Sequence, residues 1–174
     1  DNASSGDVIS VGVGEYVENI TVDKRLKIIG AGNGDDPDLD TIIASAVSSV
    51  PVVKINASGD SETDRLEINN LRIQGTGTGA NGITIVTGGG SFTTLDNVVS
   101  VYNDKYGLEG NFSGVIEDLE ISNCVLSNNE KAGFRTGSSA GINGLTITDT
   151  QADNNQVAGL YFNGPITGMT LTGG

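Results

Sequence analysis

A motif that repeats at a fixed spacing of 26 residues constrains the fold of this chain more than any other feature of its sequence. The step separates equivalent residues in three columns: Asn97, Asn123 and Asp149; Asn103, Asn129 and Asn155; and Gly107, Gly133 and Gly159. A repeat of about 20–50 residues indicates a solenoid, in which each unit buries its apolar face against its neighbours. We therefore expect a stack of similar coils.

Short apolar groups recur inside each repeat unit. In the most regular unit they are Leu119 with Ile121, residues 124–126, and Phe134 with Thr136. Strands that pair with their equivalents one coil away, about 4.8 Å apart, form a parallel β-helix. With 26 glycines, few aromatic residues and no helical periodicity, the sequence predicts an all-β, three-faced parallel β-helix of roughly six coils. Segments 30–41 and 57–65 break the period and are expected to be insertions.

The charge balance limits the partners of the protein. It has 22 acidic and 9 basic residues, which give a formal net charge of −13 at pH 7. A field of this sign repels phosphate backbones, so nucleic-acid binding is not expected. The sequence has no apolar run of membrane-spanning length and no secretory signal, so no membrane insertion is expected.

The first coil carries a resemblance to a known family. Residues 6–30, GDVISVGVGEYVENITVDKRLKIIG, resemble the opening of pectin-lyase-like right-handed β-helix proteins. The resemblance implies a right-handed solenoid. The length of the chain and the lack of a linker predict a single domain over residues 1–174, and the acidic composition favours an extracellular or cell-surface location. Proteins of this superfamily usually have a helical cap, so the chain is expected to be a fragment that lacks complete N- and C-terminal caps.

The superfamily contains polysaccharide lyases, hydrolases and epimerases as well as non-enzymatic proteins, so fold alone does not give the activity. The chain has no histidine, which excludes the Ser-His-Asp and Cys-His arrangements. We also expect no basic cluster to face an acidic stack, and we assign no catalytic residue and no required cofactor.

These observations favour a non-catalytic extracellular or cell-surface module that binds a polysaccharide or cell-surface glycan. One alternative is a polysaccharide-active lyase, glycoside hydrolase or epimerase of the same superfamily. Another is a structural filament or adhesin subunit, which would associate end to end or adjoin flanking domains.

The candidate carbohydrate site lies on one outward column. Glu109, Arg135 and Tyr161 are 26 residues apart, so they should stack on adjacent coils and form an ion pair and a cation–π contact. The other candidates precede the same strands: Tyr102, Lys105, Tyr106 and Lys131. Tyrosines beside charged groups on a rigid sheet suit sugar recognition, although a ladder that only stabilises the coils fits the same pattern.

The candidate metal site is an acidic turn. Asp35, Asp36, Asp38 and Asp40 place four carboxylates within six residues, and calcium prefers oxygen ligands from a flexible loop. The spacing does not match an EF-hand, and a solvated acidic turn is the alternative. The asparagine columns are interpreted as structural ladders, and Cys124 as a buried, unreactive thiol on an inward line.

Overall fold

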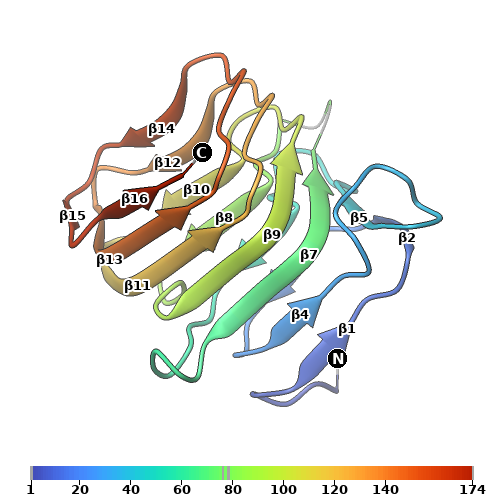
Figure 1. Cartoon of the computed structure of the whole chain (residues 1–174), viewed down its shortest axis with the longest axis horizontal. Helices are drawn as coiled ribbons and strands as arrows, with labels where there is room; N and C mark the ends of the chain where they lie inside the picture. The colour runs from blue at the N-terminus through green and yellow to red at the C-terminus, as the bar shows by residue number, and fades with distance from the viewer. Residues whose placement is uncertain (1, 76, 78, 174) are drawn as a thin grey trace.

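The protein is a right-handed, three-faced parallel β-helix of about six coils, as predicted. The computed structural model describes residues 2–75, 77 and 79–173, which form strands and turns. Figure 1 shows the coils stacked from the N-terminus at the lower right toward the upper left, where the C-terminal strands lie.

Ten strands form one sheet, which folds around a corner and supplies the first and second faces. They are β1 (Val8–Ser10), β2 (Gly14–Val17), β4 (Lys27–Ile29), β5 (Thr41–Ala44), β7 (Leu66–Gln74), β9 (Thr93–Val101), β11 (Gly114–Ser122), β13 (Ala140–Thr148), β15 (Ile166–Thr167) and β16 (Thr170–Thr172). The first half of β7 lies on the first face, where it pairs with β4, and its second half lies on the second face, where it pairs with β5.

Six strands form the other sheet, which is the third face. They are β3 (Ile20–Val22), β6 (Val53–Ile55), β8 (Ile83–Val86), β10 (Leu108–Asn111), β12 (Ala132–Thr136) and β14 (Ala158–Phe162). Leu108 pairs with Phe134 and Phe134 with Leu160, which confirms the predicted step between coils.

The corner between the first and second faces depends on residues in the left-handed region. Asn70, Asn97, Asn123 and Asp149 occupy equivalent corners with φ of 56°, 53°, 53° and 45°. Asparagine and aspartate tolerate this conformation better than other residues with a Cβ. The repeated asparagine column therefore fixes where each coil bends.

The interior consists of apolar columns that run along the solenoid. Ile68, Leu95 and Ile121 are each at most 1% exposed and stack on successive coils of the first face. A Cβ on Gly133 would lie 2.5 Å from the Leu126 carbonyl oxygen, so only glycine fits where the chain enters the third face.

The Asn103 column forms the predicted ladder. The Asn103 Nδ2 donates to Asn129 Oδ1 at 2.8 Å, and the Asn129 Nδ2 donates to Asn155 Oδ1 at 3.0 Å. The Asn97 column forms the ladder only in part: the Asn97 Nδ2 donates to Asn70 Oδ1 at 2.6 Å, whereas the Asn123 Nδ2 donates to Asp96 Oδ1 of the preceding coil at 2.8 Å. Those corners are held by their backbone conformation and by side-chain hydrogen bonds between neighbouring coils.

The two insertions account for the irregular early coils. The first-face register pairs Lys27 with Glu67, a longer step along the chain than in later coils, because both insertions lie between β4 and β7. The regular step holds from β9 to β11, where Thr93 pairs with Leu119. Insertion of extra residues between strands lengthens the loops without changing the coil cross-section.

Candidate functional site

The outward column of the third face has the predicted register. Thr84 pairs with Glu109, Glu109 with Arg135, and Arg135 with Tyr161 on four successive strands. The predicted ion pair is present, because the Arg135 Nη1 donates to Glu109 Oε1 at 2.7 Å. The column therefore places an acid, a base and an aromatic residue on three adjacent strands, as the repeat indicated.

Glu109 is not at the surface, although its side chain points outward. The residue is 8% exposed, and its second oxygen accepts a hydrogen bond from Asn81 Nδ2 at 2.7 Å. Both carboxylate oxygens therefore already have protein partners. The sequence-based expectation of an exposed Glu109 was wrong, because the Arg135 guanidinium and the Asn81 amide lie against its carboxylate.

Asn19 holds the loop at 45–51 in place. Its Oδ1 accepts hydrogen bonds from the backbone N–H groups of Ala46 and Val47 at 3.0 and 2.7 Å. Its Nδ2 donates to the carbonyl oxygens of Val50 and Pro51 at 3.1 and 2.9 Å. One half-buried amide thereby fixes the loop that forms a wall beside the third face.

Tyr106 is the aromatic ring that the cations contact. The Lys131 Nζ lies 5.5 Å and the Arg135 Cζ lies 5.4 Å from the centroid of the Tyr106 ring. The predicted stacking partner of Arg135 was Tyr161, and the cation–π contact is with Tyr106 instead. Tyr161 is 45% exposed and leaves its ring accessible on the next coil.

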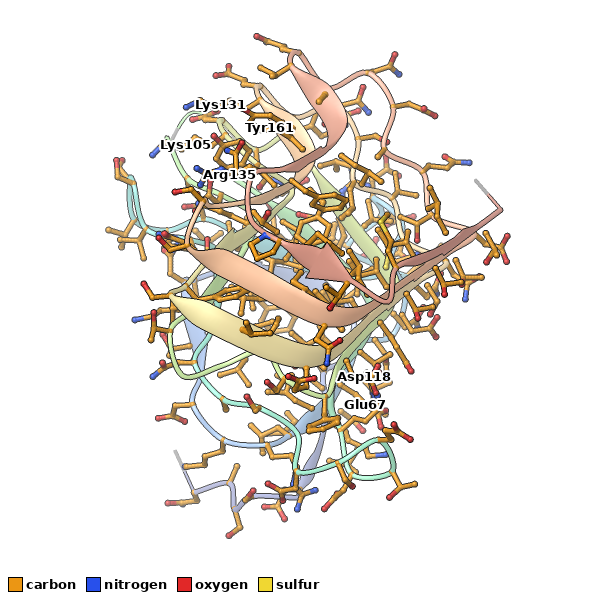
Figure 2. The ribbon with its side chains drawn as sticks, turned by 90° about the vertical axis from the view of Figure 1, so that its left-hand side faces the viewer. Glu67, Lys105, Asp118, Lys131, Arg135 and Tyr161 are labelled. Atoms are coloured by element: carbon orange, nitrogen blue, oxygen red, sulfur yellow. The ribbon has the colours of Figure 1, made fainter. Side chains whose placement is uncertain are left out.

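The other sequence-predicted candidates divide between two faces. Figure 2 shows Lys105, Lys131, Arg135 and Tyr161 gathered at one end of the view, far from Glu67 and Asp118. Tyr102 contacts the second face, because the Arg72 Cζ lies 5.8 Å from its ring centroid. Six of the seven candidates thus belong to the third face: Lys105, Tyr106, the buried Glu109, Lys131, Arg135 and Tyr161.

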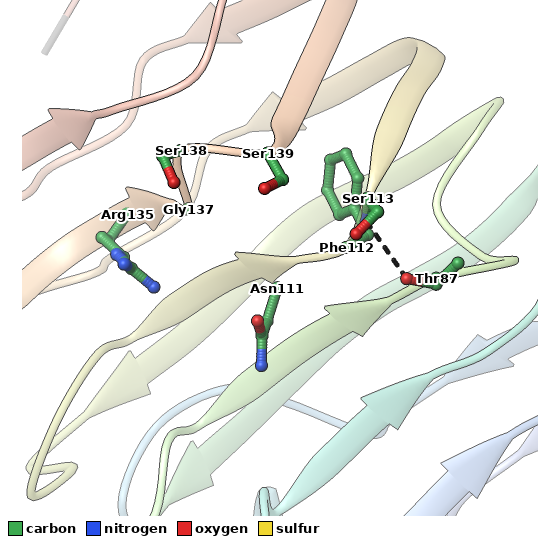
Figure 3. Close-up of a pocket in the computed structure, with 8 residues that line it drawn as sticks. All are labelled: Thr87, Asn111, Phe112, Ser113, Arg135, Gly137, Ser138 and Ser139. Atoms are coloured by element: carbon green, nitrogen blue, oxygen red, sulfur yellow. Dashed lines mark hydrogen bonds between the residues drawn. The ribbon is translucent and has the colours of Figure 1, made fainter.

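Two cavities flank the Glu109–Arg135 pair and share Asn111. The smaller, of about 340 Å³, is shown in Figure 3 and is lined by Thr87, Asn111, Phe112, Ser113, Arg135, Gly137, Ser138 and Ser139. The larger, of about 510 Å³, is lined by Ser49, Val50, Pro51, Lys54, Asn81, Thr84, Val86, Lys105, Glu109 and Asn111. Hydroxyls, amides and cations dominate both linings.

Sequence analysis missed Lys54, Asn81 and Asn111. Lys54 is in register with Thr84 and so belongs to the same outward column as Glu109. The steps from Lys54 to Thr84 and from Thr84 to Glu109 both differ from the regular repeat, so a search at the regular spacing does not reach Lys54.

Basic residues do face acidic residues on the first face, contrary to the sequence-based expectation. Arg65 is 8% exposed, and its guanidinium donates to Asp118 Oδ2 at 2.7 Å and to Thr94 Oγ1 at 2.6 Å. A cavity of about 520 Å³ beside it is lined by Glu62, Phe92, Glu117, Asp118, Glu120, Asn143 and Gly144. Spacing did not reveal this cluster, because Arg65 follows an insertion.

In the acidic turn at 35–40, two of the carboxylates accept hydrogen bonds from backbone N–H groups of the same turn. Asp36 Oδ1 accepts from the Asp38 backbone N–H at 3.0 Å, and Asp40 Oδ2 accepts from the Asp36 N–H at 3.2 Å. Among residues 2–75, 77 and 79–173, no group of three or more carboxylate, thiol or imidazole side chains is placed to hold a metal ion. Calcium binding by Asp35, Asp36, Asp38 and Asp40 remains a prediction.

Cys124 is buried, as predicted. The residue is 1% exposed, and burial raises the pKa of the thiol from 9.0 to about 12. Its Sγ lies 3.1 Å from the Ser122 carbonyl oxygen, to which it donates. The thiol is therefore protonated and inaccessible near neutral pH.

In the described part of the chain, no helix is long and apolar enough to cross a membrane.

Comparisons with known proteins give no family assignment. A scan against protein-family models, a search of curated proteins and a search of solved structures found no significant match.

Proposed function

We propose that this chain is a non-catalytic, extracellular or cell-surface module of the pectin-lyase-like superfamily that binds carbohydrate on its third face. The superfamily assignment rests on the pattern in residues 6–30 and on the parallel β-helix of about six coils. The binding role rests on one observation. The exposed Tyr161 and the half-buried Tyr106, which two cations contact, lie beside two polar cavities on a rigid sheet.

The chemistry of this surface suits a sugar. Tyrosine rings offer an apolar face to the C–H groups of a pyranose and a hydroxyl to its rim. Asn111, Ser138 and Ser139 supply donors and acceptors around the smaller cavity (Figure 3). Because the strands are fixed by neighbouring coils, these groups lose little conformational freedom when a ligand binds.

A glycan array followed by calorimetry tests the proposal. Tyr161→Ala and Lys131→Ala should each reduce binding, while the melting temperature stays nearly unchanged because both side chains are exposed. Val115→Ala and Lys27→Ala are matched controls on other strands and should bind normally. If the unmutated protein gives no signal on the array, carbohydrate binding is contradicted, and the Glu109, Arg135 and Tyr161 column only stabilises the coils.

A second candidate is an enzyme that acts on uronate polysaccharides at the first face. The acidic cavity beside Arg65 favours it, because carboxylates near an arginine can serve acid–base chemistry. Incubation with pectate and alginate, followed by assays for unsaturated products and reducing ends, tests this candidate. Turnover that Glu120→Gln abolishes and Tyr161→Ala leaves intact would support it.

We also propose that the turn at Asp35, Asp36, Asp38 and Asp40 binds calcium weakly. Asp35 and Asp38 are exposed, and a divalent cation would relieve the repulsion between neighbouring carboxylates. Calorimetry with and without Asp38→Asn measures this directly. No heat and no calcium-dependent change in melting temperature would reduce the turn to solvated surface.

A further inference from the structure

Two lysines that line the larger third-face cavity have no charge partner. The ammonium groups of Lys54 and Lys105 make no hydrogen bond or ion pair with any residue that the structure describes. Both residues are half-buried. A cation that is partly desolvated and unpaired is a favourable position for an anion.

These two lysines lack a carboxylate partner although acids outnumber bases by 22 to 9 in the chain. Four of the seven other basic residues are paired with carboxylates: Lys27 with Glu67, Arg25 with Asp60 and Asp64, Arg65 with Asp118, and Arg135 with Glu109. Arg72 and Lys131 lie over the rings of Tyr102 and Tyr106. Lys54 and Lys105 face the same cavity, and each is left without such a partner.

The one carboxylate in the cavity wall does not neutralise the lysines. Glu109 gives one oxygen to Arg135 and the other to Asn81, each at 2.7 Å. Its charge is balanced by the Arg135 guanidinium. The cavity between Lys54 and Lys105 consequently carries two uncompensated positive charges inside a protein whose net charge is −13.

The rest of the lining suits a sugar that carries the anion. The hydroxyl of Thr84 accepts from Asn81 Nδ2 at 3.1 Å, so two polar side chains are held in the cavity wall. Val50, Pro51 and Val86 provide an apolar wall for the ring C–H groups. A volume of about 510 Å³ falls within the range of about 300–1,000 Å³ that small-ligand sites have.

We propose that this cavity is an anion subsite in which Lys54 and Lys105 bind the carboxylate or sulfate group of an acidic saccharide. The inference rests on the proposed carbohydrate-binding function and specifies the class of glycan. Lysine ammonium groups act as point charges and lack the fixed bidentate geometry of arginine, so they can bind either a carboxylate or a sulfate. The subsite adjoins the Tyr106–Arg135 cluster through Glu109, so one saccharide chain can contact both.

Nuclear magnetic resonance titration of the ¹⁵N-labelled protein tests the subsite with glucuronate, glucose 6-sulfate and glucose at constant ionic strength. We expect both anionic sugars to shift the amide signals of the cavity residues and glucose to leave them in place. Response to a single anion identifies which group the subsite takes. Equal shifts with glucose would overturn the proposal.

Charge-removing variants locate the anion. Lys54→Gln and Lys105→Gln should each weaken binding by about ten-fold, as expected for loss of a charged hydrogen bond. Lys27→Gln changes the net charge equally on the first face and should bind as the unmutated protein does. Anion binding that survives in the Lys54→Gln, Lys105→Gln double variant would contradict the assignment.

The array separates this inference from the proposed function. If Tyr161→Ala abolishes polysaccharide binding and the lysine variants do not affect it, the protein binds carbohydrate and the anion subsite is wrong. If sulfated or uronate monosaccharides bind at the lysines but no polysaccharide binds, the anion subsite stands and the polysaccharide-binding role of Tyr106 and Tyr161 fails.

Discussion

The carboxylate of Glu109 is buried, and Arg135 is the cation that compensates its charge. Arg135→Ala would leave this carboxylate with Asn81 as its main partner. We expect the free energy of unfolding to fall by about 1–3 kcal/mol, the usual cost of losing a charged hydrogen bond to a buried group. Urea denaturation followed by circular dichroism measures the change.

Lys27→Ala is the matched control, because it removes a cation from a more exposed pair with Glu67, where the lysine side chain is 41% exposed. Its expected cost is at most about 1 kcal/mol. The double variant Glu109→Gln, Arg135→Ala should recover part of the loss. If the Arg135→Ala variant is as stable as the Lys27→Ala variant, the Glu109–Arg135 pair contributes no more than an exposed ion pair does.

The thiol of Cys124 gives a second residue-scale prediction. Burial raises its pKa from 9.0 to about 12, so the native protein should resist a thiol reagent at about pH 8 and react only after unfolding in urea. The raised pKa also stabilises the fold below pH 9, and this contribution is lost as pH rises toward about 12. Rapid labelling of the native protein would contradict the assignment.

At the scale of structural elements, the asparagine ladder holds the turns between the second and third faces. Asn129 is 1% exposed, and its Oδ1 accepts from both the backbone N–H and the Nδ2 of Asn103. Asn129→Ala leaves the buried Asn103 backbone N–H without its partner and the Asn103 Nδ2 with only Ser100 Oγ, so we expect a loss of roughly 2–3 kcal/mol in unfolding free energy. Gln156→Ala, at an exposed position of the next turn, should change stability little. Equal melting temperatures for the two variants would rule out the ladder as a stabilising element.

The sheet edge at the C-terminal coil sets a prediction for the whole molecule. Residues 154–173 contain no charged side chain, and Val157, Met169 and Leu171 are 65%, 41% and 55% exposed. Uncharged strand edges with exposed apolar residues favour pairing with other chains. We therefore predict end-to-end self-association that increases with protein concentration, which sedimentation velocity can measure.

Leu171→Lys places a charge at this edge and should lower the association. Val115→Lys is the control, since it adds the same charge on β11, at the side of the solenoid. A protein that sediments as a monomer at every concentration would remove the filament and adhesin alternatives. Equal effects of the two substitutions would show that net charge, and not the edge, controls association.

The sequence alone determined the architecture and the regular part of the site. Residues repeated at a fixed step must occupy equivalent positions on successive coils, because each coil pairs with the next in register. The stacking of Glu109, Arg135 and Tyr161, the Asn103 ladder and the burial of Cys124 all follow from that geometry.

Only the tertiary structure decided which of these groups are accessible and what they contact. The loop at 45–51 and the insertions lie outside the period, so the cavity that the loop forms with Lys54 and Glu109, and the ion pairs of Arg25, have no counterpart in the repeat. Long side chains also choose partners across coils, as Arg135 does with Tyr106. Periodicity fixes the position of each Cβ along the solenoid, whereas burial and contact depend on non-repeating loops and on rotamers.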